Sequence, residues 1–508
     1  MLNIIPKPYK IIDNEKRKTI DGFSVNCPID LYDGIKLFMA EYSVFSSGKY
    51  TINIIKKQMD DSAYNLIVKQ SGIVIEVSSS LGLFYATRSL KQIIEIKNNK
   101  LYISLCQIYD KPKFKYRSFS LDESRHFFGK DEVKKIIDIL SLLKIRYFHW
   151  HLSDDQGFRI NFKKYPKLYE IGSSRERTKI INDFGNNYDE TVYKHAYEEE
   201  DIIEIINYAE ERFISIIPEF DMPGHTASIV ASYPYLHCLD KQIKVFDGVA
   251  GNYDIICPSK ETTYEFLDGL FSEIMKLFEK SEYIHLGGDE VIPTNWSNCP
   301  HCIAKMKELG YDDPHQLQSY FSKRFISMLE KYNKKMIMWH DGIKDDTFEN
   351  VILQYWTWQM DKAGIDKINQ GRPTIYSPCS QVYFDSAYAE LPLNRVYGRG
   401  IVLDGLTPKG RSSIFGMECC SWNEFVRDCS FLEFMIFPRI HAFAESCWTY
   451  KNKLDYDDFK LRLDYHMKYL DELGMNYCKK HLYDNEHNEM KISPIFRKYN
   501  RYVEYDQN

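Results

Sequence analysis

The feature that most constrains this fold is a regular alternation of short apolar strands with amphipathic helices between residues 113 and 450. Strand-like segments occur at residues 118–122, 147–151, 215–220, 283–287, 335–339, 351–356, 374–376 and 414–418. Helical segments between them include residues 131–143, 198–212, 262–278 and 314–332. Strands that alternate with helices indicate parallel pairing, and this number of strands predicts an α/β fold, a (β/α)8 TIM barrel.

Two smaller regions flank the predicted barrel. Residues 1–112 hold β-like runs and one amphipathic helix at residues 81–94, which together predict a small N-terminal α+β domain. Its strand-like runs are residues 50–54, 64–68 and 73–77. The Asp-Lys-Pro-Lys stretch at residues 110–113 is typical of a linker. Residues 451–508 combine a helical stretch with a polar tail and predict a C-terminal helical extension beyond the barrel at 113–450.

Charge and hydropathy exclude several classes of partner. The 66 basic and 72 acidic residues are interspersed without a basic stripe, so nucleic acid is not the expected partner. No apolar run approaches the roughly 18–20 residues that span a bilayer, so no membrane partner is expected. Residues 1–18 lack a secretory pattern, and we expect a cytoplasmic protein with reduced cysteines, or a secreted one if a leader has been removed. The sequence leaves a homodimer open.

Polar and charged side chains gather where five of the predicted strands end. These clusters are residues 122–126, 151–155, 219–225, 285–290 and 339–341. Active sites of TIM barrels lie at the C-terminal ends of the strands, and charges are costly to bury without a role. We therefore expect these clusters to share one pocket.

The residue types in this pocket indicate carbohydrate chemistry. Asp289 and Glu290 follow a Gly-Gly turn, and several tryptophans follow them in the chain: Trp339, Trp356, Trp358 and Trp422. Paired carboxylates supply the acid and base groups for glycosidic cleavage, and tryptophan faces stack on sugar rings. An isolated Asp-Glu pair is more often a surface turn, but the surrounding clusters favour a site.

A metal-dependent hydrolase is an alternative, because histidines accompany the acids. The histidines that could serve are His149, His151, His225, His285 and His340. We expect His149 and His151 to face opposite sides of their strand, so that one points away from the pocket, and no metal or cofactor is predicted. Cys299 and Cys302 have CxxC spacing but no second pair at zinc-ribbon distance, which predicts an ordinary pair of thiols.

Three segments together resemble glycoside hydrolase family 20, the β-N-acetylhexosaminidases. They are FHWHLSDDQGFRI at 148–160, PEFDMPGHT at 218–226 and HLGGDEV at 285–291, in the family's order and at predicted strand ends. The segments YRSFSLDESRHFF at 116–128 and MECCSWNEF at 417–425 extend the likeness. It covers about residues 4–450.

The resemblance implies an exo-acting enzyme that removes terminal β-linked GlcNAc or GalNAc from a glycan or glycoconjugate. It further implies a retaining mechanism in which the substrate's own acetamido group forms an oxazolinium ion. Glu290 would be the general acid, and Asp289, which we expect to remain ionised, would orient the acetamido group. Neighbours on an extended chain point apart, so each acid could serve a different part of the substrate.

The resemblance also assigns residues that bind the sugar. Arg125 would hold the hydroxyls at C3 and C4, since its planar fork fixes several donors. Glu424 would accept the hydroxyls at C4 and C6. Tyr383 would donate to the acetamido carbonyl, with Asp385 nearby.

Further positions would form and support the walls of the pocket. The expected wall residues are Trp339, Trp356 and Trp422. Asp154 and His225 would orient the acid. Many family members carry one more tryptophan in the segment equivalent to residues 387–400, where this chain has none, and Tyr388 and Tyr397 are the candidates to replace it.

Two alternatives keep the barrel fold. One is an enzyme that releases a disaccharide, as lacto-N-biosidase-like relatives do, which would depend on the depth of the loops. The other is a non-catalytic glycan-binding protein, which would require the loss of Asp289 or Glu290; both are present.

Overall fold

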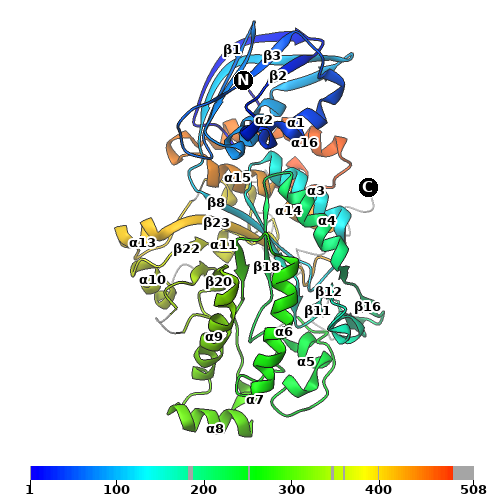
Figure 1. Cartoon of the computed structure of the whole chain (residues 1–508), viewed down its shortest axis with the longest axis vertical. Coiled ribbons are helices and arrows are strands. Elements are labelled where there is room, and N and C mark those ends of the chain that lie inside the picture. The colour runs from blue at the N-terminus through cyan, green and yellow to red at the C-terminus, as the bar shows by residue number, and fades with distance from the viewer. Residues whose placement is uncertain are drawn as a thin grey trace.

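The computed structural model describes residues 2–180, 187–249, 252–344, 348–357, 361–388, 390–398 and 400–483. In this part of the chain an N-terminal sheet domain sits on one end of a barrel, and a late helix lies beside both (Figure 1). The predicted polar tail from residue 484 onward and Trp358 lie outside the described residues.

The central element is a closed barrel of parallel strands, as predicted. Its strands are β8 (Tyr116–Asp122), β9 (Tyr147–His151), β18 (Ser215–Glu219), β19 (Tyr283–His285), β20 (Lys335–Trp339), β21 (Ile352–Tyr355), β22 (Thr374–Tyr376) and β23 (Ile414–Ser421). Each coincides with a predicted strand segment. Almost all of their residues are buried, which explains why they are apolar runs in the sequence.

Helices cover the outside of the barrel. The longer ones are α3 (Lys130–Leu142), α4 (Glu199–Glu210), α6 (Glu261–Leu277), α9 (Gln316–Leu329), α10 (Lys362–Asn369), α14 (Cys429–Ile436) and α15 (Arg439–Trp448). In α3 the residues Val133, Ile136, Ile137 and Leu140 recur at helical spacing and are buried in the core shared with the strands. Further helices lie in the connecting segments: α5 (Ala227–Ser232), α7 (Thr294–Ser297), α8 (Pro300–Leu309), α11 (Cys379–Val382), α12 (Leu393–Val396) and α13 (Pro408–Ser413). The apolar stripes of these helices face the sides of the strands. The ends of the strands are therefore covered by the connecting loops.

The N-terminal domain is a sheet covered by two helices. The sheet has the order β1 (Lys10–Ile20), β7 (Lys100–Asp110), β4 (Tyr64–Lys69), β5 (Gly72–Val77), β3 (Tyr50–Lys56) and β2 (Phe23–Asn26), and β6 (Ile94–Lys97) also pairs with β7. Its helices are α1 (Asp33–Glu41) and α2 (Ser80–Gln92). Ser79 caps α2 by accepting a hydrogen bond from the Gly82 amide. This domain has its own apolar core.

A buried ion pair joins the N-terminal domain to the barrel. Lys144 Nζ lies 3.1 Å from Asp110 Oδ2, and both side chains are fully buried. Trp448 Nε1 donates to the other oxygen of Asp110 at 2.9 Å, and its ring packs into the N-terminal core. The segment predicted as a linker is therefore held rigidly where it enters the barrel.

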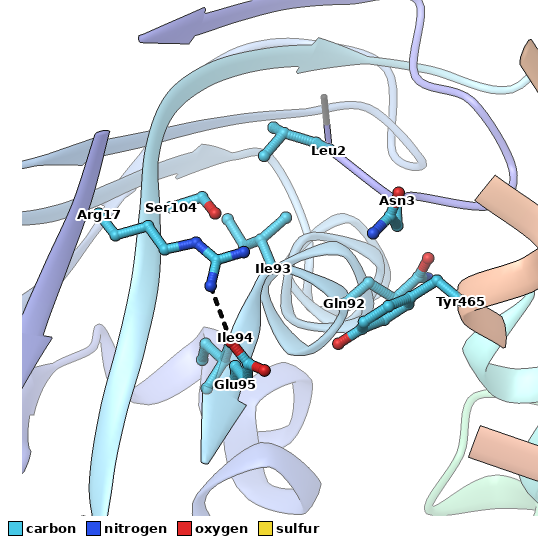
Figure 2. Close-up of a pocket in the computed structure, with 9 residues that line it drawn as sticks. All are labelled: Leu2, Asn3, Arg17, Gln92, Ile93, Ile94, Glu95, Ser104 and Tyr465. Atoms are coloured by element: carbon cyan, nitrogen blue, oxygen red, sulfur yellow. Dashed lines mark hydrogen bonds and ion pairs between the residues drawn. The ribbon is translucent and has the colours of Figure 1, made fainter. Parts of the chain in front are cut away.

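Helix α16 (Tyr456–Glu472) ties the start of the chain to the end of the barrel. Arg462 makes two hydrogen bonds to Glu445 of α15, at 2.7 and 2.8 Å, and a third to the Ile4 carbonyl. Tyr465 of α16 lines a cavity of about 60 Å³ beside the N-terminal sheet, where Arg17 pairs with Glu95 at 2.7 Å (Figure 2). This volume holds a few water molecules, so the cavity is too small for a sugar. None of the described helices is both long and apolar enough to cross a membrane.

The buried Asp110–Lys144 pair provides a test of the domain junction. We expect Lys144→Met to lower the free energy of unfolding by about 3 kcal/mol or more, because Asp110 would be left buried without its cation. Lys56→Met is the matched control, since Lys56 pairs with Asp30 on the surface and such pairs contribute about 1 kcal/mol or less. Denaturant titration of both variants measures the difference; equal losses would show that the junction does not depend on this pair.

Candidate active site

All eight strands of the barrel deliver predicted site residues to its C-terminal end. They are Arg125 after β8, Asp154 after β9, His225 after β18, Asp289 and Glu290 after β19, Trp339 in β20, Trp356 after β21, Tyr383 and Asp385 after β22, and Trp422 and Glu424 after β23. Parallel strands of a barrel end at one face, so residues far apart in the chain meet there. The structure brings all of these predicted residues together, while their individual roles stay predictions.

Trp422 lies at the centre of this group. Its ring centroid is 5.8 Å from that of Trp339 and 6.2 Å from that of Tyr383. The Arg125 guanidinium lies over the same ring at 5.3 Å, and His151 meets it edge-on at 5.1 Å. One half-buried indole therefore connects groups from β8, β9, β20, β22 and β23.

Arg125 is fixed by acids on two sides. Its guanidinium lies 2.7 Å from Asp154 Oδ2 and 3.9 Å from Glu424 Oε1. Burial opposes ionisation of Asp154, but Arg125 and His225 hold the pKa of its carboxyl well below the usual range. Burial raises the pKa of Glu424, against the opposing effect of Arg125, and the Asp385 carboxylate adds to the rise. The guanidinium thus has its direction set before any ligand arrives.

His225 connects this acidic group to the adjacent pair Asp289 and Glu290. Its Nδ1 lies 3.1 Å from Asp154, while its Nε2 lies 3.9 Å from Asp289 Oδ2 and 3.8 Å from Glu290 Oε2. Burial would lower the pKa of His225, but Asp154, Asp155 and Asp221 raise it well above its usual value. A cationic imidazole therefore stands between the acids, as expected of a group that orients them.

The Gly-Gly turn before the acids is a steric necessity. A Cβ on Gly287 would lie 2.0 Å from Asp221 Oδ1, and Gly287 and Gly288 both have positive φ, at 62° and 98°. The Gly288 amide donates to the same Asp221 oxygen at 2.7 Å. Asp221 thereby fixes the strand end from which Asp289 projects.

Asp289 and Glu290 have different surroundings, although both lie beside His225. The Asp289 carboxyl is largely buried, while the Glu290 side chain is 55% exposed. Glu290 has a φ of 50°, a left-handed conformation that is strained for a residue with a side chain. The chain is therefore not extended at Glu290, contrary to the expectation from the sequence, and a left-handed residue stands at this turn. The two acids nevertheless have different environments, as that prediction requires.

The surroundings of Asp289 in the protein alone work against the expected ionisation of its carboxyl. Burial raises the pKa of Asp289 to about 7, with His225 opposing and Asp341 adding to the rise. Burial and the neighbouring Asp289 raise the pKa of Asp221 well above its usual value. Ionising two neighbouring buried carboxyls costs free energy, because their charges repel. Asp221 and Asp289 therefore share protons until another group stabilises the second charge.

Several groups in the site were not singled out from the sequence. Asp341 accepts from Trp356 Nε1 at 2.8 Å and from the Glu290 amide at 3.2 Å, so it locks Trp356 beside the acid. Asp221, described above, is the second. The signal available for both was their position directly after a predicted strand, in the clusters 219–225 and 339–341.

A layer of buried histidines lies beneath the site, and it corrects the expectation for His149 and His151. Residues two apart on a strand share a face, and both histidines contact Glu219 Oε2, at 3.1 and 2.5 Å. Burial would lower their pKa values, but the Glu418 and Glu219 carboxylates raise that of His149 to about 9, and Glu219 and Asp154 raise that of His151 to about 10. This layer is a network of ion pairs.

Donor atoms that could hold a metal converge at two places in and below the site. They are the groups His149, Glu219 and His285, and Asp154, Asp155 and His225, with Asp221 and Asp289 close to the second. Their charges are already matched by each other and by Arg125. A further group, made of four cysteines, contains none of the predicted site residues.

Tyr388 and Tyr397 do not replace the missing tryptophan. Both are buried, and their hydroxyls donate to the Phe437 carbonyl at 2.9 Å and to Glu445 at 2.8 Å, beneath α14 and α15. Their apolar rings complete the packing of the barrel's last helices. The prediction that they stack on a leaving sugar is therefore wrong.

Comparison with known proteins confirms the resemblance found in the sequence. Residues 114–451 match the catalytic domain of glycosyl hydrolase family 20, and residues 34–111 match domain 2 of that family. The chain is 32% identical to a β-hexosaminidase of Porphyromonas gingivalis over 94% of this chain and 64% of the relative. It is 34% identical to a β-hexosaminidase of Vibrio furnissii over 76% of this chain and 65% of the relative. The chain thus spans less than two thirds of the length of both relatives.

Solved structures share the same architecture. An exo β-N-acetylglucosaminidase from Vibrio harveyi, in complex with N-acetylglucosamine, matches with a TM-score of 0.82 and 31% identity, over 94% of this chain and 78% of that one. The β-N-acetylhexosaminidase of Bacteroides fragilis matches with a TM-score of 0.81 and 28% identity, over 96% and 99%. The family matches cover the barrel and most of the N-terminal domain, and the chain belongs to glycosyl hydrolase family 20.

Proposed function

We propose that the chain is an exo-acting β-N-acetylhexosaminidase, which hydrolyses terminal, non-reducing β-linked GlcNAc or GalNAc. The acetamido oxygen of the substrate attacks the anomeric carbon and forms an oxazolinium ion, while Glu290 gives its proton to the departing glycosidic oxygen. Glu290 then takes a proton from the water that opens this ion, so the configuration is retained. The terminal sugar of a glycan or glycoconjugate is the substrate.

The observation that carries this proposal is the buried Oδ1 oxygen of Asp289. It accepts no hydrogen bond from an N–H or hydroxyl group of the described residues, and the neighbouring group on this side chain is another acid, Asp221. A buried acceptor without a donor costs about 1–3 kcal/mol, which a ligand N–H can recover. The acetamido N–H of the substrate is such a donor, and its nitrogen becomes positive as the oxazolinium ion forms. An ionised Asp289 would then stabilise the transition state more than the ground state.

The remaining groups support a site for one terminal sugar. The ring centroids of Trp339 and Tyr383 lie 5.8 and 6.2 Å from that of Trp422, and Tyr383 lies close enough to Asp289 to interact with its charge. Such a group of rings suits the N-acetyl methyl group and the sugar face. Arg125, held by Asp154 and Glu424, suits the hydroxyls at the far end of the ring. A cation fixed there would close the site to a longer chain and favours release of a single unit.

The proposed activity is tested with two chromogenic substrates that differ only at C2. We expect hydrolysis of an aryl N-acetyl-β-glucosaminide, and a kcat/KM at least about 1,000-fold lower for the aryl β-glucoside, because the glucoside lacks the internal nucleophile. Equal rates on both would contradict substrate assistance. No turnover of the N-acetylglucosaminide, together with release of disaccharide from an aryl lacto-N-bioside, would instead show the disaccharide-releasing activity.

The role of Glu290 is tested by Glu290→Gln. We expect kcat on a disaccharide, whose leaving group is poor, to fall by about 100- to 10,000-fold, because protonation of the leaving oxygen is lost. An aryl substrate with a good leaving group should lose much less, and affinity for N-acetylglucosamine should stay within a few-fold. The control is Glu330→Gln, because Glu330 is exposed and lies just before β20, at the end of the barrel strands opposite the acids. If Glu290→Gln left disaccharide hydrolysis unchanged, Glu290 would not be the acid.

The pKa of Asp289 predicts that its charge costs stability. Since its folded pKa of about 7 lies above the unfolded value, the folded form binds more protons between about pH 4 and 7, and stability falls as pH rises through this window. We expect Asp289→Asn to stabilise the fold by on the order of 3 kcal/mol more at pH 8 than at pH 4.5.

Asp154→Asn is the matched control, because Asp154 is ion-paired with Arg125. It should destabilise the fold at pH 8, by about 3 kcal/mol, since Arg125 and His225 lose their anion. Thermal melts of the native chain and both variants at the two pH values measure the effects. If Asp289→Asn destabilised the fold as much as Asp154→Asn at pH 8, the proposed electrostatic cost at Asp289 would be refuted.

A further inference from the structure

Four cysteines from two separate segments converge on one point outside the catalytic site. Cys238 and Cys257 belong to the segment between β18 and α6, and Cys299 and Cys302 belong to the segment between β19 and α9. The Sγ atoms lie within 4.8 Å of one another, and all four residues are buried. The cluster therefore includes the CxxC pair expected to be ordinary thiols, and the sequence expectation for that pair is incomplete.

The spacing of the sulfur atoms fits a tetrahedral metal ion. Cys257 Sγ lies 3.6 Å from Cys302 Sγ and 3.9 Å from Cys299 Sγ, and Cys238 Sγ lies 3.9 Å from Cys302 Sγ. Zinc bonds thiolate sulfur at about 2.3 Å, so the edges of a tetrahedral S4 site are about 3.8 Å. The cysteines are free, and these separations are far longer than the roughly 2.05 Å of a disulfide.

The backbone around the cluster is arranged to present these sulfur atoms. An antiparallel bridge joins His237 to Ile256, and Cys238 and Cys257 are the residues that directly follow these two. Cys299 is the N-cap of α8, and Cys302 lies in its first turn, where the helix N-terminus favours thiolates. Trp296 and Leu317 pack around the cluster and exclude water.

We propose that Cys238, Cys257, Cys299 and Cys302 bind one zinc ion as a closed structural site. Four thiolates fill a tetrahedral zinc ion, so no position is left for a substrate or water, and the site is not catalytic. Soft thiolate ligands in this geometry select zinc over the harder Mg²⁺ or Ca²⁺. The proposal does not depend on the glycosidase activity.

The zinc ion would join the two segments that carry the catalytic machinery. The segment with Cys238 and Cys257 begins with His225, and the segment with Cys299 and Cys302 begins with Asp289 and Glu290. Val291, next to Glu290, packs against the cysteine cluster. Helices α7 and α8 of the second segment lie at the end of the molecule opposite the N-terminal sheet, so the described part of the N-terminal domain does not support this region (Figure 1).

The test is the metal content of the full chain, purified under reducing conditions after expression with zinc. We expect elemental mass spectrometry to find about one zinc ion per native chain. Cys302→Ser and Cys257→Ser should each hold less than about one fifth of that, since three thiolates and an alcohol bind zinc far more weakly. Cys106→Ser, which changes a buried cysteine of the N-terminal domain, should keep its zinc. Replacement by cobalt(II) should give the visible absorption of a tetrahedral thiolate complex.

The native chain alone keeps the proposal falsifiable if the serine variants do not fold. Titration with a mercurial thiol reagent should release the zinc in step with modification of these four cysteines, identified by peptide mapping. A metal-free chain with all four thiols free, or with disulfides among them by intact mass, would overturn the proposal. Zinc retained in both folded serine variants, or iron in its place, would do the same.

Discussion

The site depends on the ion pairs and hydrogen bonds that the buried carboxylate of Glu219 makes. This carboxylate stands at the end of β18 and receives His151 from β9 at 2.5 Å, His285 from β19 at 2.8 Å and Trp339 from β20 at 2.9 Å. An ion in the barrel interior costs several kcal/mol unless its partners are in place. Four neighbouring strands must therefore end in register, and this requirement fixes the floor beneath Trp422 and the acids.

Above this layer, the charged groups on one side of the site form ion pairs with each other, whereas on the other side two acids lie close together. Asp154 is paired with Arg125 and His225, which makes the first side rigid and permanently charged. Asp289 is buried beside the Asp221 carboxyl, and its Oδ1 accepts no hydrogen bond from an N–H or hydroxyl group of the described residues. In the proposed reaction the substrate supplies the N–H donor to Asp289. The carboxylate then stabilises the positive amide nitrogen of the transition state selectively.

The sequence predicted the barrel well because its strands are buried on both faces and appear as apolar runs of the right length. It also predicted which residues meet at the C-terminal end of the barrel, since strand ends in a barrel meet at one face; the roles of these residues stay predictions. It failed where a side chain's environment depends on how the chain folds back. Tyr388 follows Tyr383 and Asp385 in the sequence, but it is buried beneath α14. The assignment of His149 and His151 to opposite faces was wrong because residues two apart on a strand share a face. The cysteine ligands were missed because Cys238 and Cys257 are remote in sequence from the CxxC pair.

Two members of the cysteine cluster lie on the segment that follows His225, whose own side chain is held by Asp154. His225 itself has a strained φ of 51°, and the described residues 238–249 and 252–255 that follow α5 form neither helix nor strand. Backbone pairing therefore contributes little to ordering this segment, and ordering it costs about 1–2 kcal/mol per residue in conformational entropy. Metal binding at its two cysteines would add directly to folding free energy at the place where that cost arises. Such an ion would act on catalysis only through position, by keeping the imidazole within reach of Asp289 and Glu290.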